Sequence, residues 1–339
     1  MLDHQSYRLI TLSVPALLAS AFMSGSAHAA DTASAPAQSV PEKTQQESAA
    51  WKIDNVPAPA MTDQIYLYPG DATAPNTELW TRTQGQIGNL KIESMNLRNV
   101  NRPSIIPVLP APGTSNGAGV IVVPGGAFVF LSMDEEGTRV AQALAARGYV
   151  AFILKYRLHP TPVDAAAYHE QTVAIYSASE NAKSDEMPDL TYAPAIADGR
   201  AAVTLVRSRA KEFGIQPDQV GMIGFSAGAI IVLGSAQTAS AGEGPNFIGY
   251  IYGPMLPTTV PKGQVTPLFA ALALDDGIFA KQDFGIIQSW RSAGVPVELH
   301  AYERGGHGFA LGRPGTTTTG MLDQFVLWLK MHGFGDRPR

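Results

Sequence analysis

Residues 219–236 have the sequence QVGMIGFSAGAIIVLGSA, in which Ser226 lies between two glycines. The apolar run VGMIGF is typical of a buried strand and AGAIIVLGSA of a helix, so Ser226 falls on the turn between them. Residues 224–228, Gly-Phe-Ser-Ala-Gly, match the pattern G-x-S-x-G, in which a sharp strand-to-helix turn exposes the serine Oγ. We therefore expect Ser226 to be a nucleophile. The alternative is one more small residue in a chain with 33 glycines.

Apolar runs that are typical of buried strands alternate with helical patterns on both sides of this turn. We expect strands at residues 119–123, 149–156, 220–225, 247–253, 267–274 and 295–302. Helices are predicted at residues 134–148, 195–213, 227–236, 281–294 and 317–333. This order predicts an α/β fold in one domain, a three-layer sandwich around a mostly parallel, doubly wound sheet.

Two segments depart from the alternation. Residues 51–110 are rich in proline and asparagine, and we expect strands at 90–100 and 104–111 to form an N-terminal antiparallel edge. Residues 157–194 are rich in proline and alanine, and we expect them to be mostly irregular with one short helix. Long insertions of this kind are often binding loops, so we expect the second segment to shape the pocket.

The candidate base is a histidine that follows a strand. Sites in such sheets lie at the C-terminal ends of the strands, and a serine hydroxyl needs a base that takes its proton. His307 lies in RGGHGF, a glycine-flanked loop after the predicted strand 295–302. His300 lies inside that strand and His332 in the last helix. We therefore choose His307 as the base.

The candidate acid lies in the turn Asp275-Asp276-Gly277, directly after the predicted strand 267–274. Either carboxylate could orient the imidazole, while the other caps the turn. Asp276 stands next to the glycine, at the tip of the loop, so we choose it and keep Asp275 as the alternative. The resulting order of serine, acid and histidine along the chain is the one that α/β-hydrolases have.

A second glycine-containing loop, PGGAF at residues 124–128, follows the apolar run GVIVV. A backbone with so little side-chain bulk can point several N–H groups at one spot and form an oxyanion hole. A plain tight turn or a phosphate-cradling loop is the alternative, although no Gly-Lys-Ser/Thr follows as a P-loop requires. Together with the serine turn later in the chain, the loop has the position of the loop that forms the oxyanion hole in α/β-hydrolases.

Composition excludes several classes of function. The net charge is −5 and no basic run is present, so we expect no nucleic-acid partner. The chain has no cysteine, which excludes disulfides, thiolate metal sites and a cysteine nucleophile. No spacing of histidines and carboxylates indicates a metal site, so we expect neither a metal nor an organic cofactor.

The N-terminal residues have the layout of a secretory signal. Arg8 precedes an apolar run at residues 9–22, and small residues at Ala27 and Ala29 follow. We expect a signal peptide at 1–29, a disordered leader at 30–50 and a single catalytic domain at 51–339. The protein would then be periplasmic or secreted and free of the membrane once the signal is cleaved. An uncleaved anchor or a frayed helix is the alternative.

Taken together, these motifs resemble the α/β-hydrolase superfamily and, within it, the acetylxylan-esterase-like branch of secreted carbohydrate esterases. The resemblance spans about residues 65–334 and rests on phrases such as VIVVPGGAF, KYRL, GFSAG and ERGGHGF. It implies a Ser226–His307–Asp276 triad, and an oxyanion hole formed by the N–H groups of Gly126, Ala127 and Ala227.

Three positions depart from the pattern of that branch. The chain has Ala127 and Phe128 where the branch usually has glycine and tyrosine, and Ala229 where it usually has glycine. Phe128 lacks a hydroxyl near the site, which bears on sugar recognition more than on ester cleavage.

The function that the resemblance implies is cleavage of acetyl and other short-chain esters, on carbohydrate such as acetylated xylan or oligosaccharides. A broad short-chain carboxylesterase is the first alternative, and a peptidase of the same superfamily is another. A hydrolase-fold binding protein of the cell envelope without catalysis is an alternative from a different class. Acyl length, sugar preference and oligomeric state stay open.

Overall fold

The computed structural model of the chain describes residues 51–60, 63–87, 90–181, 192–263, 266–279 and 283–335. These residues all belong to one compact unit. The predicted signal peptide (1–29) and leader (30–50) lie outside the described residues, so their boundaries stay predictions. No helix within the described ranges is both long and apolar enough to cross a membrane.

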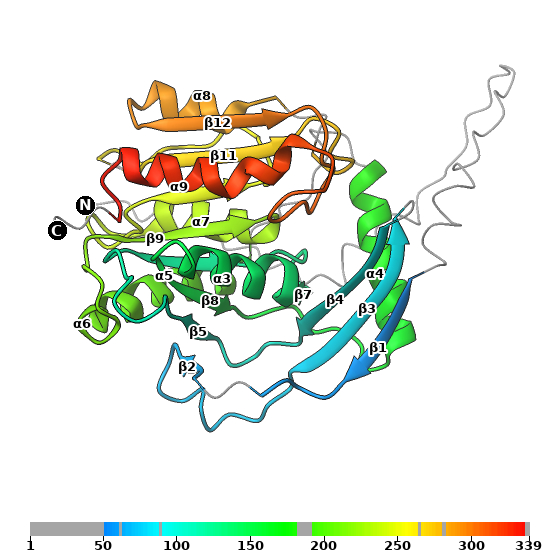
Figure 1. Ribbon diagram of the computed structural model, residues 1–339. Coiled ribbons are helices and arrows are strands. Elements are labelled where there is room, and N and C mark those ends of the chain that lie inside the picture. The colour runs from blue at the N-terminus through cyan, green and yellow to red at the C-terminus, as the bar shows by residue number, and fades with distance from the viewer. Residues whose placement is uncertain are drawn as a thin grey trace, which may run out of the picture. The chain divides into compact units, whose positions relative to one another are not determined.

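An eight-stranded sheet occupies the centre of this unit, and Figure 1 shows its strands stacked from β12 at the top to β2 at the bottom. In spatial order the strands are β12 (Val297–Tyr302), β11 (Leu268–Ala273), β10 (Ile248–Ile251), β9 (Val220–Phe225), β6 (Gly119–Val123), β8 (Val150–Lys155), β5 (Ser104–Val108) and β2 (Ile65–Tyr66). Neighbouring strands from β12 to β8 are parallel, while β5 pairs antiparallel with β8 and β2 pairs antiparallel with β5. The predicted mostly parallel, doubly wound sheet is confirmed.

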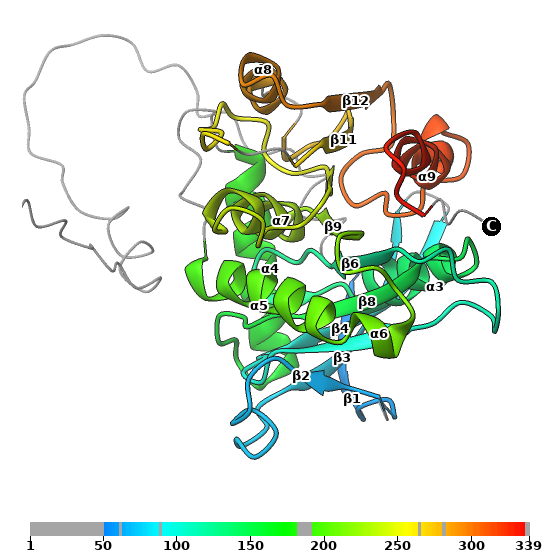
Figure 2. The ribbon, with the colours of Figure 1, turned by 90° about the vertical axis from the view of Figure 1, so that its left-hand side faces the viewer.

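Helices cover both faces of this sheet. Figure 2 shows α3 (Arg139–Ala145) and α9 (Met321–Met331) on one side, and α5 (Ala193–Ser208), α7 (Ala227–Thr238) and α8 (Gly285–Ser292) on the other. Every residue of β6, β8, β9, β10 and β11 is buried. Strands covered on both faces have continuous apolar sequences, which is why the runs in this chain predicted them correctly.

A separate four-stranded sheet holds most of the N-terminal segment. Its antiparallel strands, in order, are β1 (Lys52–Val56), β3 (Leu79–Ile87), β4 (Leu90–Arg98) and β7 (Phe130–Leu131). The prediction that residues 90–100 border the main sheet is therefore wrong, and of the two predicted strands only β5 joins the antiparallel edge of that sheet. One edge of β4 pairs with β3 along its whole length, and the other pairs with β7 at Leu97 and Arg98, so β4 belongs to the four-stranded sheet.

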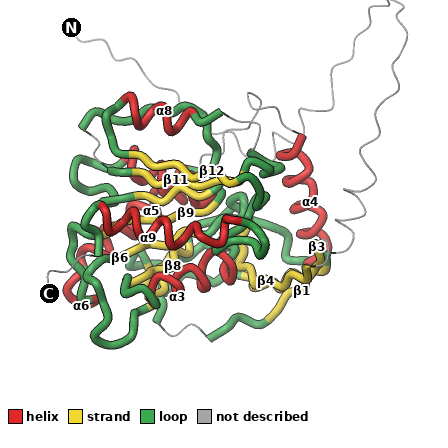
Figure 3. Tube along the Cα trace, turned by 45° about the horizontal axis from the view of Figure 1, so that its top comes forward, coloured by secondary structure: helices red, strands yellow, loops and turns green. Residues whose placement is uncertain are grey.

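The segment after β8 differs from its prediction. Instead of a short helix it contains the 17-residue α4 (Ala165–Asn181), because its alanine-rich sequence has high helix propensity. Figure 3 shows α4 beside β1, β3 and β4, and Arg98 of β4 lies over the ring of Tyr168 of α4, 4.4 Å from its centroid. Residues 182–191 lie outside the described residues.

Two predicted helices are each divided into two pieces. The pattern at 134–148 begins as a π-helix, η1 (Met133–Thr138), and continues as α3. The pattern at 195–213 divides into α5 and the short α6 (Ala210–Phe213), which Gly214 ends in the left-handed conformation at φ 65°. The remaining described elements are the helices η2 (Thr317–Gly320) and α9, which follow the loop after β12.

Candidate active site

Ser226 occupies the turn between β9 and α7, as the sequence predicts. Its backbone has φ 52° and ψ −117°, a conformation that non-glycine residues rarely adopt. The turn is tight, because a Cβ at Gly224 would collide with the backbone of Gly228. The N–H of Ser226 donates to the carbonyl of Ile251 in β10 at 2.9 Å, which ties the turn to the neighbouring strand. The result is a partly exposed serine at the N-terminus of a helix, where the helix dipole favours negative charge.

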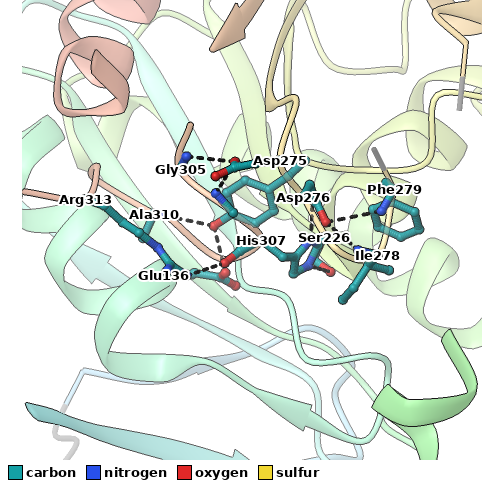
Figure 4. Close-up of polar contacts among 12 residues, drawn as sticks. Glu136, Ser226, Asp275, Asp276, Ile278, Phe279, Gly305, His307, Ala310 and Arg313 are labelled. Carbon is teal, nitrogen blue, oxygen red and sulfur yellow. Dashed lines mark hydrogen bonds and ion pairs between the residues drawn. The ribbon is translucent and has the colours of Figure 1, made fainter. Parts of the chain in front are cut away.

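His307 lies against Ser226, as Figure 4 shows. Its Nε2 atom is 2.9 Å from Ser226 Oγ, and its Nδ1 atom is 2.8 Å from Asp276 Oδ2. The histidine stands in the loop after β12 between two glycines with positive φ, and the guanidinium of Arg313 donates to its carbonyl at 2.7 Å. The structure thus brings together Ser226, His307 and Asp276 from three strand ends that are far apart in the sequence.

The two other histidines near the C-terminus have different contacts. The ring of His300 lies 2.7 Å from Glu298, within β12. The ring of His332 packs edge-on against Trp328 of α9, with 4.9 Å between centroids. Both positions agree with the choice of His307 from the sequence.

Asp276 is held in the ionised form by its surroundings. Burial of its fully covered side chain opposes ionisation. Hydrogen bonding and attraction to His307, together with N–H donors from Ile278 and Phe279 at 2.8 and 3.2 Å, outweigh that effect and lower the pKa of the carboxyl. Such a carboxylate can orient the imidazole and stabilise its charged form.

The three predicted oxyanion donors belong to peptide units whose carbonyl groups already accept a hydrogen bond. The carbonyls of Gly125, Gly126 and Ser226 accept from Ser132, Val129 and Ala229, at 3.1, 2.9 and 2.9 Å respectively. In a trans peptide the N–H points opposite to the carbonyl, so the following N–H groups, those of Gly126, Ala127 and Ala227, are turned the other way. Among the described residues, no hydrogen bond uses these N–H groups.

Two buried polar residues lie next to the site without having been predicted. Glu136 of η1 is 6 % exposed and accepts hydrogen bonds from the N–H of Gly125 and the hydroxyl of Tyr252, at 2.6 and 2.8 Å. Tyr252 follows β10, so the rule of strand ends could have singled it out. Glu136 gave no signal in the sequence, because a glutamate in an amphipathic helical pattern is ordinarily solvated.

The ends of the 157–194 segment contact residues 124–128, the loop predicted to form the oxyanion hole. Phe128 is 4 % exposed, and its ring packs edge-on against Tyr156 and Tyr192. The ring of His159 lies over Tyr192, with 4.0 Å between centroids, and the N–H of His159 donates to the carbonyl of Phe128 at 2.9 Å. The segment thus contacts the site's loop, and whether it shapes the pocket stays a prediction.

Comparison with known proteins identifies the family. The dienelactone hydrolase family matches residues 108–321, more than half of the 339-residue chain. The chain belongs to the dienelactone hydrolase family. The match begins at the end of β5, so this hydrolase carries most of its four-stranded sheet ahead of the matched region.

A curated relative is an acetylxylan esterase from Xylanibacter ruminicola, 23% identical over 270 residues. The alignment covers 70% of this chain and 50% of that protein, so this family member matches about half the length of its relative. The family match confirms the predicted resemblance to α/β-hydrolases and supports the predicted enzyme class, a carboxylic ester hydrolase.

Solved structures share the fold. An acetyl ester-xyloside bifunctional hydrolase from Caldicellulosiruptor lactoaceticus superposes with a TM-score of 0.55 and 20% identity, covering 70% of this chain and 90% of that one. An α/β-hydrolase enzyme from a Medee basin deep-sea metagenome library gives 0.51 and 18%, covering 83% and 98%. A butyrate-bound esterase from Thermogutta terrifontis gives 0.51 and 18%, covering 70% and 92%. The α/β-hydrolase fold of this family member is confirmed.

Proposed function

We propose that the chain is a serine esterase that releases short acyl groups, chiefly acetyl, from carbohydrate esters such as acetylated xylan or oligosaccharides. The observation that carries the proposal is the continuous contact from Ser226 Oγ to His307 Nε2 and from His307 Nδ1 to Asp276 Oδ2, at 2.9 and 2.8 Å. The name of the acetylxylan esterase relative supports acetyl esters of carbohydrate as the substrate class.

The first half of the reaction acylates the enzyme. His307 Nε2 takes the proton of Ser226 as Oγ attacks the ester carbonyl, and Asp276 stabilises the imidazolium that forms. The tetrahedral oxyanion accepts hydrogen bonds from the N–H groups of Gly126, Ala127 and Ala227. His307 then gives its proton to the leaving alcohol, which leaves an acyl group on Ser226.

The second half releases the acyl group. His307 takes a proton from a water molecule, whose oxygen attacks the acyl carbonyl through a second tetrahedral intermediate held by the same N–H groups. Collapse of this intermediate returns the proton from His307 to Ser226 Oγ and frees the carboxylic acid. The steps require no group beyond the side chains, the backbone donors and water.

The test compares the wild-type protein with Ser226→Ala on p-nitrophenyl acetate and then on acetylated xylan and xylo-oligosaccharides. We expect wild-type hydrolysis of both kinds of substrate, and a loss of about 10⁴-fold or more in kcat for the variant. If wild type and variant are equally inactive on a panel of short esters, the chain is a binding protein with this fold, and the proposal fails.

A broad short-chain carboxylesterase is the second candidate. It is favoured by Phe128, whose ring is buried among aromatic side chains and brings no hydroxyl to the oxyanion loop for a sugar. Cleavage of p-nitrophenyl esters without release of acetate from acetylated sugars would select this candidate.

Export completes the proposal. The N-terminal residues have the layout of a signal peptide, with cleavage after Ala29, and acetylated polysaccharide lies outside the cytoplasm. N-terminal sequencing of the mature protein should begin at Ala30. Full-length protein retained in the cytoplasm would contradict it.

A further inference from the structure

A buried hydrogen-bonded chain joins the loops that flank Ser226. Oε2 of Glu136 accepts the N–H of Gly125 in the oxyanion loop (residues 124–128) at 2.6 Å. Oε1 of Glu136 accepts the hydroxyl of Tyr252 at 2.8 Å, and the tyrosine oxygen in turn accepts the N–H of Ala310 in the histidine loop (residues 303–310) at 3.1 Å. Figure 4 shows Glu136 and Ala310 on the side of His307 away from Phe279.

We propose that Glu136 is a positioning residue, which holds the oxyanion loop and the histidine loop in register with each other through Gly125, Tyr252 and Ala310. The inference rests on the proposed function, because the two loops supply the oxyanion donors and the base of that reaction. Glu136 itself contacts neither the serine oxygen nor the imidazole nitrogens, so it acts through the residues that it binds.

Both polar groups of the peptide unit between Pro124 and Gly125 are hydrogen-bonded to side chains outside the oxyanion loop. The carbonyl of Pro124 accepts the hydroxyl of Tyr156 at 2.8 Å, and the N–H of the same peptide unit donates to Glu136. A Cβ at Gly125 would lie 2.8 Å from Glu136 Oε2 and 2.9 Å from the Cβ of Ser226. The carboxylate therefore packs directly against the peptide that precedes the two free donors, and fixes the plane of that peptide.

Most of the described non-glycine residues with positive φ lie in or next to the segments that these hydrogen bonds connect. The described non-glycine residues with positive φ, apart from Asn99, are Ala127, Phe128, Ser226, Tyr252 and Ala310. Such a backbone conformation is unfavourable for a non-glycine residue and persists only where the surrounding structure holds it in place. The hydrogen bonds that Gly125 and Tyr252 donate to one buried carboxylate supply part of that constraint.

At the other end of this series of hydrogen bonds, Tyr252 packs against the imidazole of His307. The ring of Tyr252 packs edge-on against His307 with 5.0 Å between centroids, and against Phe309 with 4.7 Å. Removing the hydroxyl bond would leave this ring free to tilt beside the base. Glu136 thereby affects both the donors on one side of Ser226 and the base on the other.

Electrostatics favour a functional reason for the carboxylate. Burial raises the pKa of Glu136, and the hydrogen bonds from Tyr252 and Gly125 and the attraction of His307 only partly offset this effect. A buried carboxylate lowers stability relative to an apolar side chain of the same size. Glu135, which precedes Glu136 on η1, is paired with Arg139 at the surface and opposes ionisation of Glu136.

The experiment uses the full chain with Glu136→Leu, Glu136→Gln and Tyr252→Phe. The matched controls are Glu135→Gln, on the same helix, and Tyr250→Phe, which removes a buried hydroxyl bonded to Pro254 at 2.6 Å. For p-nitrophenyl acetate we expect Glu136→Leu to lower kcat by about 10- to 100-fold, with KM within roughly threefold. Tyr252→Phe should lose about tenfold, and the controls less than about twofold.

Glu136→Gln is the conservative rescue. Its amide oxygen can accept from Gly125 and its NH₂ can donate to the oxygen of Tyr252, so kcat should stay within about threefold of wild type. The double variant Glu136→Leu/Tyr252→Phe should lose no more than Glu136→Leu alone, because both act through one connection. Equal losses in the Gln and Leu variants, or additive losses in the double variant, would overturn the inference.

Amide hydrogen exchange gives a readout that does not depend on catalysis. Glu136→Leu should raise the exchange of residues 124–132 and 303–312 and leave α8 unchanged. If wild type cleaves no ester, the proposed function fails while this measurement still decides the connection. A uniform rise in exchange across the described residues would instead indicate global destabilisation and sink the inference.

Discussion

Asp275 and Asp276 are neighbours in the sequence but bind different parts of the histidine loop. Asp276 Oδ2 lies 2.8 Å from Nδ1 of His307, whereas Asp275 Oδ1 accepts the N–H groups of Gly305 and Gly306 at 2.9 and 2.7 Å. Asp276 is buried and Asp275 is exposed. One carboxylate contacts the imidazole and the other contacts only the backbone that carries it.

Replacing each aspartate by asparagine should therefore give unequal losses. Asp276→Asn removes the negative charge beside His307 and permits the wrong tautomer, so we expect kcat to fall by about 10³- to 10⁴-fold. Asp275→Asn keeps an acceptor for the two glycines and should lose less than about fivefold. Steady-state kinetics on p-nitrophenyl acetate measure both, and the reverse ranking would transfer the acid's role to Asp275.

The lowered pKa of Asp276 also predicts how stability depends on pH. Because its folded-state pKa lies below the ordinary value of 3.8 for an aspartate, the ionised carboxylate stabilises the fold above that pH. The contribution declines as the pH falls below 3.8 and through the folded-state pKa. Urea unfolding at several pH values should show the stability difference between wild type and Asp276→Asn shrinking in that acidic range. A constant difference would contradict the linkage.

Ala127 tests the oxyanion loop. Its φ of 52° suits glycine, so Ala127→Gly should keep kcat within about twofold. Ala127→Val places a β-branched side chain at positive φ, which should displace the N–H and lower kcat by about 10- to 100-fold. The control is Ala301→Val, at an exposed position of β12 where valine is favoured. Wild-type kcat in Ala127→Val would remove this N–H from the proposed oxyanion hole.

A buried ion pair away from the site provides a test of its contribution to the free energy of unfolding. Lys155 Nζ lies 2.9 Å from Glu78 Oε2 and 2.8 Å from Gln64 Oε1, with its own side chain fully covered. Burial lowers the pKa of Lys155, and Glu78 partly restores it. Glu78→Ala leaves the ammonium buried without its partner and should cost about 3–5 kcal/mol in urea unfolding.

The control for that variant is Asp323→Ala, which breaks the exposed pair with Arg147 and should cost less than about 1 kcal/mol. Equal costs for Glu78→Ala and Asp323→Ala would mean that solvent reaches the Lys155 pair.

The parts of the site that the sequence predicted share one property. Each of these residues, Ser226, Asp276 and His307, follows an apolar run long enough to be assigned as a buried strand. Because the C-terminal ends of parallel strands lie at the same edge of a sheet, the three could be predicted to lie near one another. The choice between Asp275 and Asp276 from the adjoining glycine agrees with the geometry. Their catalytic roles stay predictions until the variants are measured.

Other features depend on packing that no local pattern encodes. Glu136 stands 11 residues after Gly125, whose N–H it accepts in a buried hydrogen bond. The sequence of β4 is typical of a strand in either sheet, and its pairing with both β3 and β7 places it in the four-stranded one. The length of α4 was underestimated because prolines at both ends of its segment suggested irregular chain.

The short strand β7 begins two residues after the oxyanion loop and pairs with β4 at Leu97–Leu131 and Arg98–Phe130. The sheet that lies mostly outside the family match is thus fastened to the loop that would hold the oxyanion. This attachment makes the loop depend on the four-stranded sheet when the protein is heated. If the four-stranded sheet opens first, the catalytic loop loses its anchor while the eight-stranded sheet is still folded, and inactivation precedes unfolding.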